Sequence, residues 1–77
     1  MWVHNRYQAG HEELGLIEAA SRRSEAQNAA ERWLDNSGLN DPTRGIFVHD
    51  TMARRGQPSL WMMTRHRKWY VAEWRED

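Results

Sequence analysis

Two short basic runs are the segments of this chain best suited to bind an anionic partner. The first is Arg54-Arg55, and the second covers residues 65–68 and directly precedes Trp69. Guanidinium groups bind phosphate and carboxylate groups in a bidentate manner, and aromatic rings stack on nucleic-acid bases. The pattern favours contact with an acidic or nucleic-acid-bearing surface. The alternative is that both runs lie in solvated loops whose charge prevents aggregation of sheet edges.

The other reactive side chains do not form a recognisable catalytic or metal-binding pattern. The four histidines are scattered, and a histidine next to an acidic residue in a strand points to the opposite face. The chain has no cysteine, which excludes disulfides, thiolate metal sites and a cysteine nucleophile. It also lacks a glycine-rich phosphate loop and a Gly-x-Ser-x-Gly motif. We therefore expect a non-enzymatic protein that has no metal and no cofactor.

Charge and length limit the kind of protein further. The 77 residues include 11 basic and 11 acidic side chains, so overall charge cannot drive nucleic-acid binding. Residues 1–43 contain four basic and seven acidic side chains, whereas residues 44–77 contain seven basic and four acidic ones. The length suits one domain over residues 1–77. Because we find neither the apolar core of a signal peptide nor a membrane-spanning apolar run, we expect a cytoplasmic protein without a membrane partner.

Apolar spacing predicts one helix from Ser24 to Asp35. The predicted buried stripe has the i, i+3, i+4, i+7 spacing of a helix and consists of Ala26, Ala29, Ala30 and Trp33. Ser24 is the predicted N-cap, and Gly38 is expected to take a left-handed conformation after the last turn. Because the stripe is mostly alanine, its partner should be a bulky face of a sheet that fills the volume.

Five segments around this helix are predicted to be strands: residues 2–8, 13–20, 45–50, 59–64 and 69–74. The resulting order is β-β-α-β-β-β, and we expect an α+β fold in which one helix packs on one face of an antiparallel sheet. Ala9-Gly10 is the predicted first turn. Residues 65–68 are predicted to form a four-residue hairpin loop.

The loop length in the last hairpin decides which side chains share a face. With a four-residue loop, Thr64 pairs with Trp69, and the two faces alternate from there. One face then contains Leu60, Met62, Trp69 and Val71, and the other contains Trp61, Met63, Tyr70, Ala72 and Trp74. We expect the second set to face the helix and the first to form an exposed apolar patch. Such a patch indicates an interaction site, and a homodimer contact or an intramolecular cover is the open alternative.

One further pattern is formed by residues 17–26, Gly45, Leu60-Trp61 and Arg67-Lys68-Trp69. Together these segments resemble a family of small phage anti-CRISPR proteins that block a type I CRISPR surveillance complex, and the resemblance covers about half of the chain. It implies a five-stranded antiparallel sheet with one helix. It also implies binding to the backbone subunits of the complex, so that target DNA cannot pair with the guide. The family uses basic residues on its helix, where this chain has Gln27 at the first position and Arg32 at a later one.

The leading hypothesis is a small inhibitor that binds and occludes a host macromolecular machine, either a protein or a ribonucleoprotein complex. Its candidate partner-binding residues are Arg32, Arg54, Arg55, Arg65, Arg67, Lys68 and Trp69. Two alternatives remain open. The first is direct nucleic-acid binding by the arginine loops, which would weaken steeply with salt. The second is a homodimer with a structural role.

Overall fold

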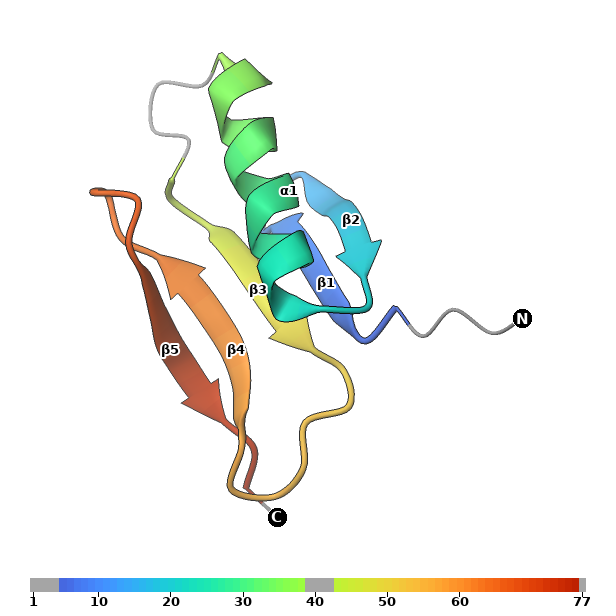
Figure 1. The fold of residues 1–77 in the computed structure, drawn as a ribbon. Helices are drawn as coiled ribbons and strands as arrows, with labels where there is room; N and C mark the ends of the chain where they lie inside the picture. The colour runs from blue at the N-terminus through green and yellow to red at the C-terminus, as the bar shows by residue number, and fades with distance from the viewer. Residues whose placement is uncertain (1–4, 39–42, 77) are drawn as a thin grey trace.

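The computed structural model describes residues 5–38 and 43–76, and within them it contains one helix and five strands (Figure 1). Their bounds are β1 (Tyr7–His11), β2 (Gly15–Ala20), α1 (Arg23–Ser37), β3 (Ile46–Asp50), β4 (Pro58–Met63) and β5 (Trp69–Trp74). This order confirms the predicted β-β-α-β-β-β arrangement. The predicted helix is present and extends by one residue at its start and two at its end.

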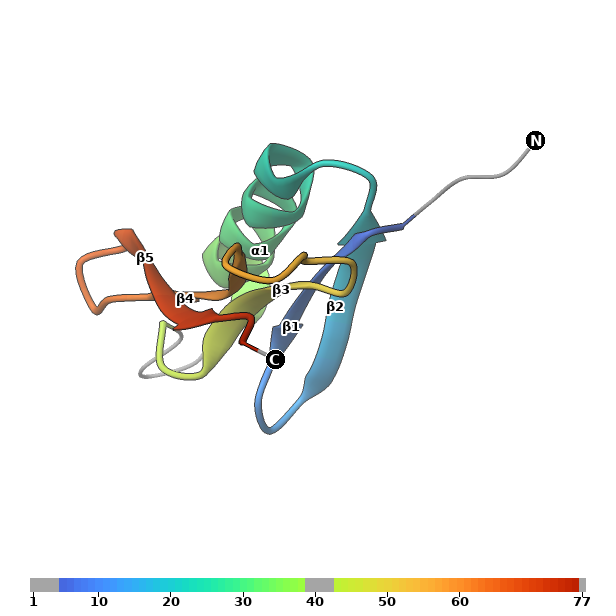
Figure 2. The same cartoon turned by 90° about the horizontal axis from the view of Figure 1, so that it is seen from below.

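The strands form a single antiparallel sheet in the order β2-β1-β3-β4-β5. Helix α1 packs on β1, β2 and β3, so the β4–β5 hairpin extends beyond it (Figure 1). Seen from below, α1 lies on one side of the sheet, and no described element covers the other side (Figure 2). We call the side without the helix the open face.

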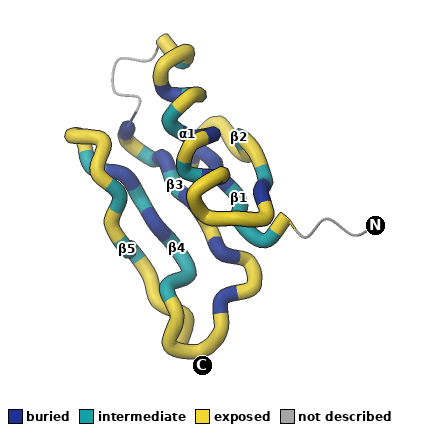
Figure 3. Tube along the Cα trace, in the orientation of Figure 1, coloured by how far each residue is buried: buried dark blue, intermediate teal, exposed yellow. Residues whose placement is uncertain are grey.

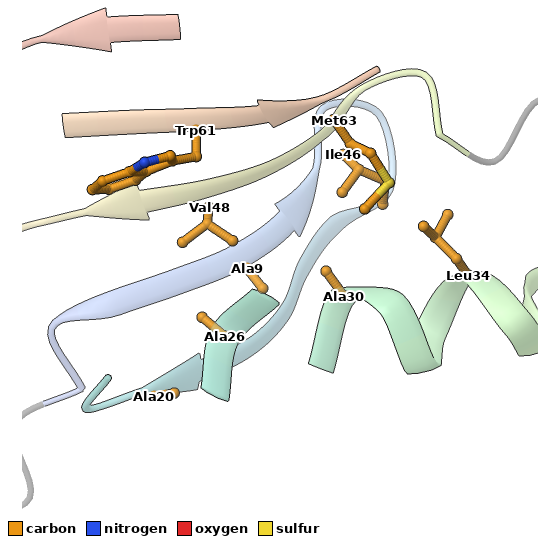
Figure 4. Packing of buried hydrophobic residues seen from close by; sticks show 9 residues of the cluster. All are labelled: Ala9, Ala20, Ala26, Ala30, Leu34, Ile46, Val48, Trp61 and Met63. Atoms are coloured by element: carbon orange, nitrogen blue, oxygen red, sulfur yellow. The ribbon is translucent and has the colours of Figure 1, made fainter. Parts of the chain in front are cut away.

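The core lies between α1 and the sheet (Figure 4). Its buried members are Ala9, Ala20, Ala26, Ala30, Leu34, Ile46, Val48, Trp61 and Met63. Alanine dominates where α1 crosses β1 and β2, which lets the helix backbone approach the sheet closely. Apart from Leu34 on α1, the large members lie on β3 and β4, as the alanine stripe predicts. In Figure 3 the buried positions follow the inner side of α1 and these central strands.

The two ends of α1 differ in how well they match the prediction. Gly38 takes the expected left-handed conformation after the last turn, with φ 66°. The predicted N-cap at Ser24 is wrong, because the N-cap is Arg22 in an extended conformation, without a side-chain capping bond. Only Ser21 and Arg22 separate β2 from α1, so the chain turns into the helix before it reaches Ser24.

The predicted turn at Ala9-Gly10 is also wrong, because both residues lie inside β1. A side chain at position 10 would place its Cβ 2.7 Å from Cζ of Phe47 on the neighbouring strand. Glycine is therefore needed here to make room for an aromatic ring and not to bend the chain. The strand predicted at residues 2–8 shifts toward the C-terminus as a result, and residues 2–4 of the prediction lie outside the described residues.

The hairpin between β4 and β5 has a three-residue loop instead of the predicted four-residue loop. The N–H of Thr64 donates to the carbonyl of Lys68 at 2.8 Å, and the N–H of Arg67 donates to the carbonyl of Thr64 at 3.0 Å. Arg67 has a left-handed conformation, with φ 61°. A turn followed by one left-handed residue is a common three-residue hairpin connection.

This shorter loop changes the faces of Trp69, Tyr70 and Val71, and beyond Val71 the pairing is irregular, with Glu73 opposite Leu60. Met63 pairs with Trp69, and Trp61 pairs with Val71. Because a one-residue shift in register moves side chains to the opposite face, Trp69 and Val71 lie on the helix side and pack against the core. Tyr70, which we predicted to be buried, is 47% exposed instead. Trp74, also predicted to be in the core, is 55% exposed.

Candidate interaction surface

One row of directly paired residues crosses the open face from edge to edge. Its members, one from each strand, are Leu16, Gly10, Phe47, Met62 and Tyr70. The residues next to Phe47 in β3 are fully buried in the core on the other side of the sheet. Because strand side chains alternate, the row must face away from α1. We call these five residues the apolar row.

The apolar row is exposed at its two ends. Leu16 on the edge strand β2 is 63% exposed, and Tyr70 on the edge strand β5 is 47% exposed. Phe47 and Met62 are half-buried between them, where Phe47 covers the glycine of β1. Water contact of this apolar surface costs about 25 cal/mol per Å². None of the four side chains belongs to the core, so core packing does not account for their size.

The row beside the apolar row is mixed in character. It pairs Gln8 with His49, His49 with Leu60, and Leu60 with Glu73. Leu60 extends the apolar surface, and the other three side chains place polar groups next to it. An apolar centre with a polar rim is the usual composition of a protein–protein interface.

The structure does not bring the two basic runs together. Arg54 and Arg55 lie in the loop that connects β3 with β4, whereas residues 65–68 lie at the other end of β4 (Figure 1). A six-residue strand spans about 20 Å. The two runs therefore flank opposite ends of the β4–β5 hairpin and do not form one basic patch.

Two of the predicted binding arginines interact with the chain itself on the helix side. The Nη2 of Arg67 lies 2.8 Å from Oδ1 of Asp35 and also donates to the carbonyl of Glu31, which ties the hairpin loop to α1. Arg32 on α1 lies 3.9 Å from a carboxylate oxygen of Glu18 on β2. Arg65 and Lys68 are exposed in the hairpin loop.

Trp69 is not the exposed anchor that we predicted. Its side chain packs against the core, and its Nε1 atom is buried. The aromatic residues of the open face are instead Phe47 and Tyr70. The alternation in the sequence of β3 already contained this signal, because Phe47 stands between two β-branched residues that both belong in the core. For Tyr70 no such signal exists, since its face depends on the hairpin loop.

A pocket of about 190 Å³ lies on the helix side, near the start of α1. Its lining residues are Arg6, Tyr7, Arg23, Asp50, Gln57, Pro58 and Trp61. Nε and Nη2 of Arg6 donate to the two carboxylate oxygens of Asp50 at 2.7 and 2.8 Å. The N–H of Met52 donates to the same carboxylate at 2.9 Å.

The electrostatics of this ion pair follow from its burial. The Asp50 side chain is only 2% exposed. Burial alone would raise the pKa of Asp50, but the hydrogen bonds from Arg6 and Met52 outweigh it, so the pKa of Asp50 lies below its ordinary value. The hydrogen bond to Asp50, together with the charge of that carboxylate, raises the pKa of Arg6. Both groups are therefore charged at neutral pH, and their charges cancel.

Neither surface has the composition of a metal centre. Within residues 5–38 and 43–76, no group of three or more histidine, aspartate or glutamate side chains is placed to hold a metal ion. Among the same residues, no helix is long and apolar enough to cross a membrane. Comparison of the chain with protein-family models, curated proteins and solved structures finds no match. Function must therefore be inferred from the open face and from the pocket.

Proposed function

We propose that this chain is a non-enzymatic binding protein whose open face docks on a protein surface of a larger host machine. The observation that carries the proposal is the apolar row, which spans all five strands and which no described element covers. Contiguous exposed apolar surface on a small protein is typical of an interaction site. Phe47 and Tyr70 supply aromatic rings, a residue type enriched among the residues that dominate binding energy.

Basic loops at the two ends of the β4–β5 hairpin indicate the chemistry of the partner. Arg54 and Arg55 flank one end of the β4–β5 hairpin, and Arg65 and Lys68 flank the other. Basic groups at the rim of an interface favour a partner of opposite charge and accelerate its association. The complementary surface is therefore apolar at its centre and acidic at its margin.

A protein surface fits this arrangement better than a nucleic acid does. Proteins that bind single strands combine stacking rings with a positively charged groove that follows the backbone. The row beside the apolar row contains no lysine or arginine and includes Glu73. Direct nucleic-acid binding is the alternative, because the half-buried ring of Phe47 and the exposed ring of Tyr70 could stack on bases. The experiment below must separate this outcome from protein binding.

The resemblance to anti-CRISPR proteins implies occlusion of a host machine in the cytoplasm. This mode of action agrees with binding through the open face, but the contact residues of the family differ. A rigid sheet that buries one whole face on its partner prevents other molecules from reaching that surface. The family, however, uses basic residues on its helix. Here Arg32 lies on α1, on the side of the sheet opposite to the open face. Contact through Arg32 would leave the open face free.

The test compares two leucines of equal exposure. Leu16 lies in the apolar row and is 63% exposed, whereas Leu14 lies in the preceding turn and is 61% exposed. Three immobilised proteins are compared: the wild type, the single variant Leu14→Ser, and a double variant with Leu16→Ser and Tyr70→Ser. Each is incubated with nuclease-treated host lysate and, separately, with a purified type I surveillance complex. Proteins that the wild type and Leu14→Ser retain should be lost from the double variant.

Two results would contradict the proposal. One is a partner that the double variant retains as well as the wild type but that Arg32→Glu loses, which would place the contact on α1. The other is retention that disappears after nuclease treatment and falls steeply with salt, which would indicate direct nucleic-acid binding.

A further inference from the structure

The pocket near the start of α1 contains two arginine–aromatic stacks in contact with each other. The guanidinium of Arg6 lies 5.2 Å from the ring centroid of Tyr7, and that of Arg23 lies 5.1 Å from the ring of Trp61. The two rings are 6.2 Å apart and inclined by 58°. The four side chains therefore form one continuous wall of the pocket.

The two arginines differ in how their charge is balanced. Arg6 is bound to the buried carboxylate of Asp50 by two hydrogen bonds, so this pair has no net charge. Arg23 has neither a hydrogen bond nor an ion pair within the described residues, and its contact with Trp61 is a cation–π contact. The pocket consequently has one positive charge in excess, on a guanidinium whose N–H groups are available for a ligand.

We infer that this pocket binds a single carboxylate group, supplied by an acidic side chain of a partner protein. The guanidinium fork matches a carboxylate in a bidentate geometry. Because the ring of Trp61 already orients Arg23, less side-chain entropy is lost when the ligand binds. The site lies on the helix side of the sheet, so it is separate from the open face and goes beyond the function proposed for that face.

The size and walls of the pocket favour a carboxylate side chain over a larger anion. Its volume of about 190 Å³ lies below the roughly 300–1,000 Å³ of pockets that hold cofactors or nucleotides. Tyr7, Pro58 and Trp61 offer apolar walls for a methylene stem. The single excess charge equals the charge of one carboxylate, whereas a phosphate monoester carries about −1.5 to −2 at neutral pH.

The test uses N-acetylglutamate N-methylamide as the probe and its glutamine counterpart as the neutral control. Protein labelled with ¹⁵N is titrated at constant ionic strength, and the signals of the Arg23 Nε–H and the Trp61 indole N–H are followed. We expect saturable shifts at both signals with the glutamate probe and none with the glutamine probe.

Two variants of adjacent residues identify the group responsible. Arg23→Gln should lower the affinity for the glutamate probe at least tenfold. Arg22→Gln should not, because the Arg22 side chain is 81% exposed and lies 4.0 Å from Glu25, outside the pocket. Circular dichroism of both variants confirms that they are folded. Arg23→Lys keeps the charge but loses the fork, and it should bind with intermediate affinity.

Three results would overturn the inference. Equal shifts with the neutral probe would show that charge plays no part. If Arg22→Gln lowered the affinity for the glutamate probe as much as Arg23→Gln, the probe would be attracted generally to the basic start of the helix. If inorganic phosphate saturated the same two signals at a lower concentration than the glutamate probe, the pocket would be a phosphate site.

Discussion

The two faces of the sheet use side-chain size in opposite ways. On the covered face, where α1 crosses β1 and β2, the contacts are made largely by alanine, including the fully buried Ala9, Ala26 and Ala30. On the open face, the side chains are large, and Leu16 and Tyr70 remain mostly or half exposed. Folding alone would favour large residues on the covered face and small ones on the open face, because large apolar residues stabilise most when they are buried. The difference therefore separates the residues that maintain the fold from those available for a partner.

The β4–β5 hairpin shows how the covered face is completed beyond the reach of α1. Here Trp61 and Met63 supply the bulk of the core, and long basic side chains supply the cover. Arg23 stacks on Trp61, and Arg67 connects the hairpin loop to Asp35 of α1. These two arginines thus have a structural role, which cannot be recognised from the number of arginines in the sequence.

The largest expected loss of stability comes from truncating a large buried residue of the covered face. Trp61 is 6% exposed, and Trp61→Ala should lower the free energy of unfolding by about 3–5 kcal/mol, because it removes apolar contacts and leaves a cavity. Tyr70→Ala on the open face should change it by less than about 0.5 kcal/mol. Urea unfolding of both variants checks the comparison. Similar losses would mean that the two faces are equally part of the core.

A second variant tests the close approach of helix and sheet. Ala30 is completely buried on α1, so Ala30→Leu should destabilise the protein by about 1–3 kcal/mol through overpacking. Asn28→Leu, at an exposed position of the same helix, is the matched control and should have little effect. If thermal unfolding shows that Ala30→Leu is as stable as Asn28→Leu, the helix does not rest closely on the sheet.

Acid should weaken the covered face through Asp50. Its pKa is lowered in the folded protein, so the ion pair contributes stability above the unfolded value of about 3.9, and this contribution is lost as the pH falls through the lower folded value. Asp50→Asn should cost about 1–3 kcal/mol at pH 7 and should reduce the loss of stability in acid. Urea unfolding between pH 7 and pH 2 measures both effects. An unchanged acid dependence in the variant would assign it to other carboxylates.

The smallest expected effect concerns the start of α1. Since Arg22 is the N-cap and Ser24 lies inside the first turn, Ser24→Ala should shift the free energy of unfolding by less than about 0.5 kcal/mol. A capping serine would cost about 1 kcal/mol when replaced by alanine. Thermal unfolding distinguishes the two values, and a loss near 1 kcal/mol would restore Ser24 as the cap.

Local patterns in the sequence were sufficient for the elements and their order. The alanine stripe predicted α1 and its buried side, and Gly38 predicted its end. Both depend on residues within one or two turns of each other. The fold class followed from these elements, because one amphipathic helix and several short strands have few ways to bury their apolar sides.

The faces of β5 could not be predicted in the same way. Their assignment depends on whether the hairpin loop has three or four residues. The three-residue loop requires a left-handed residue, for which glycine or asparagine would be the usual signal. The chain has Arg67 there, and its side chain forms an ion pair with Asp35, 32 residues away. The local sequence therefore lacks the signal that would identify the three-residue loop, and without it the positions of Trp69 and Tyr70 cannot be predicted.

Gly10 is a second residue whose role could not be predicted from the local sequence. Its local sequence predicted a turn, whereas its conformation is that of a strand and its lack of a side chain serves Phe47. The apolar row depends on this contact, since the ring of Phe47 lies over the glycine. Sequence reasoning therefore predicted an exposed apolar patch and correctly placed Leu60 and Met62 in it, but it was wrong for Trp69 and Val71, which pack against the core.

Two adjacent methionines can show whether the open face contacts the partner, because Met62 belongs to the apolar row and Met63 to the core on the other side of β4. In a complex with the protein recovered from nuclease-treated lysate, saturation of the partner should transfer to the ε-methyl group of Met62. It should not transfer to those of Met63 or of the exposed Met52, which lies in the loop between β3 and β4. Transfer to Met52 or Met63 without transfer to Met62 would place the partner elsewhere and contradict the claim.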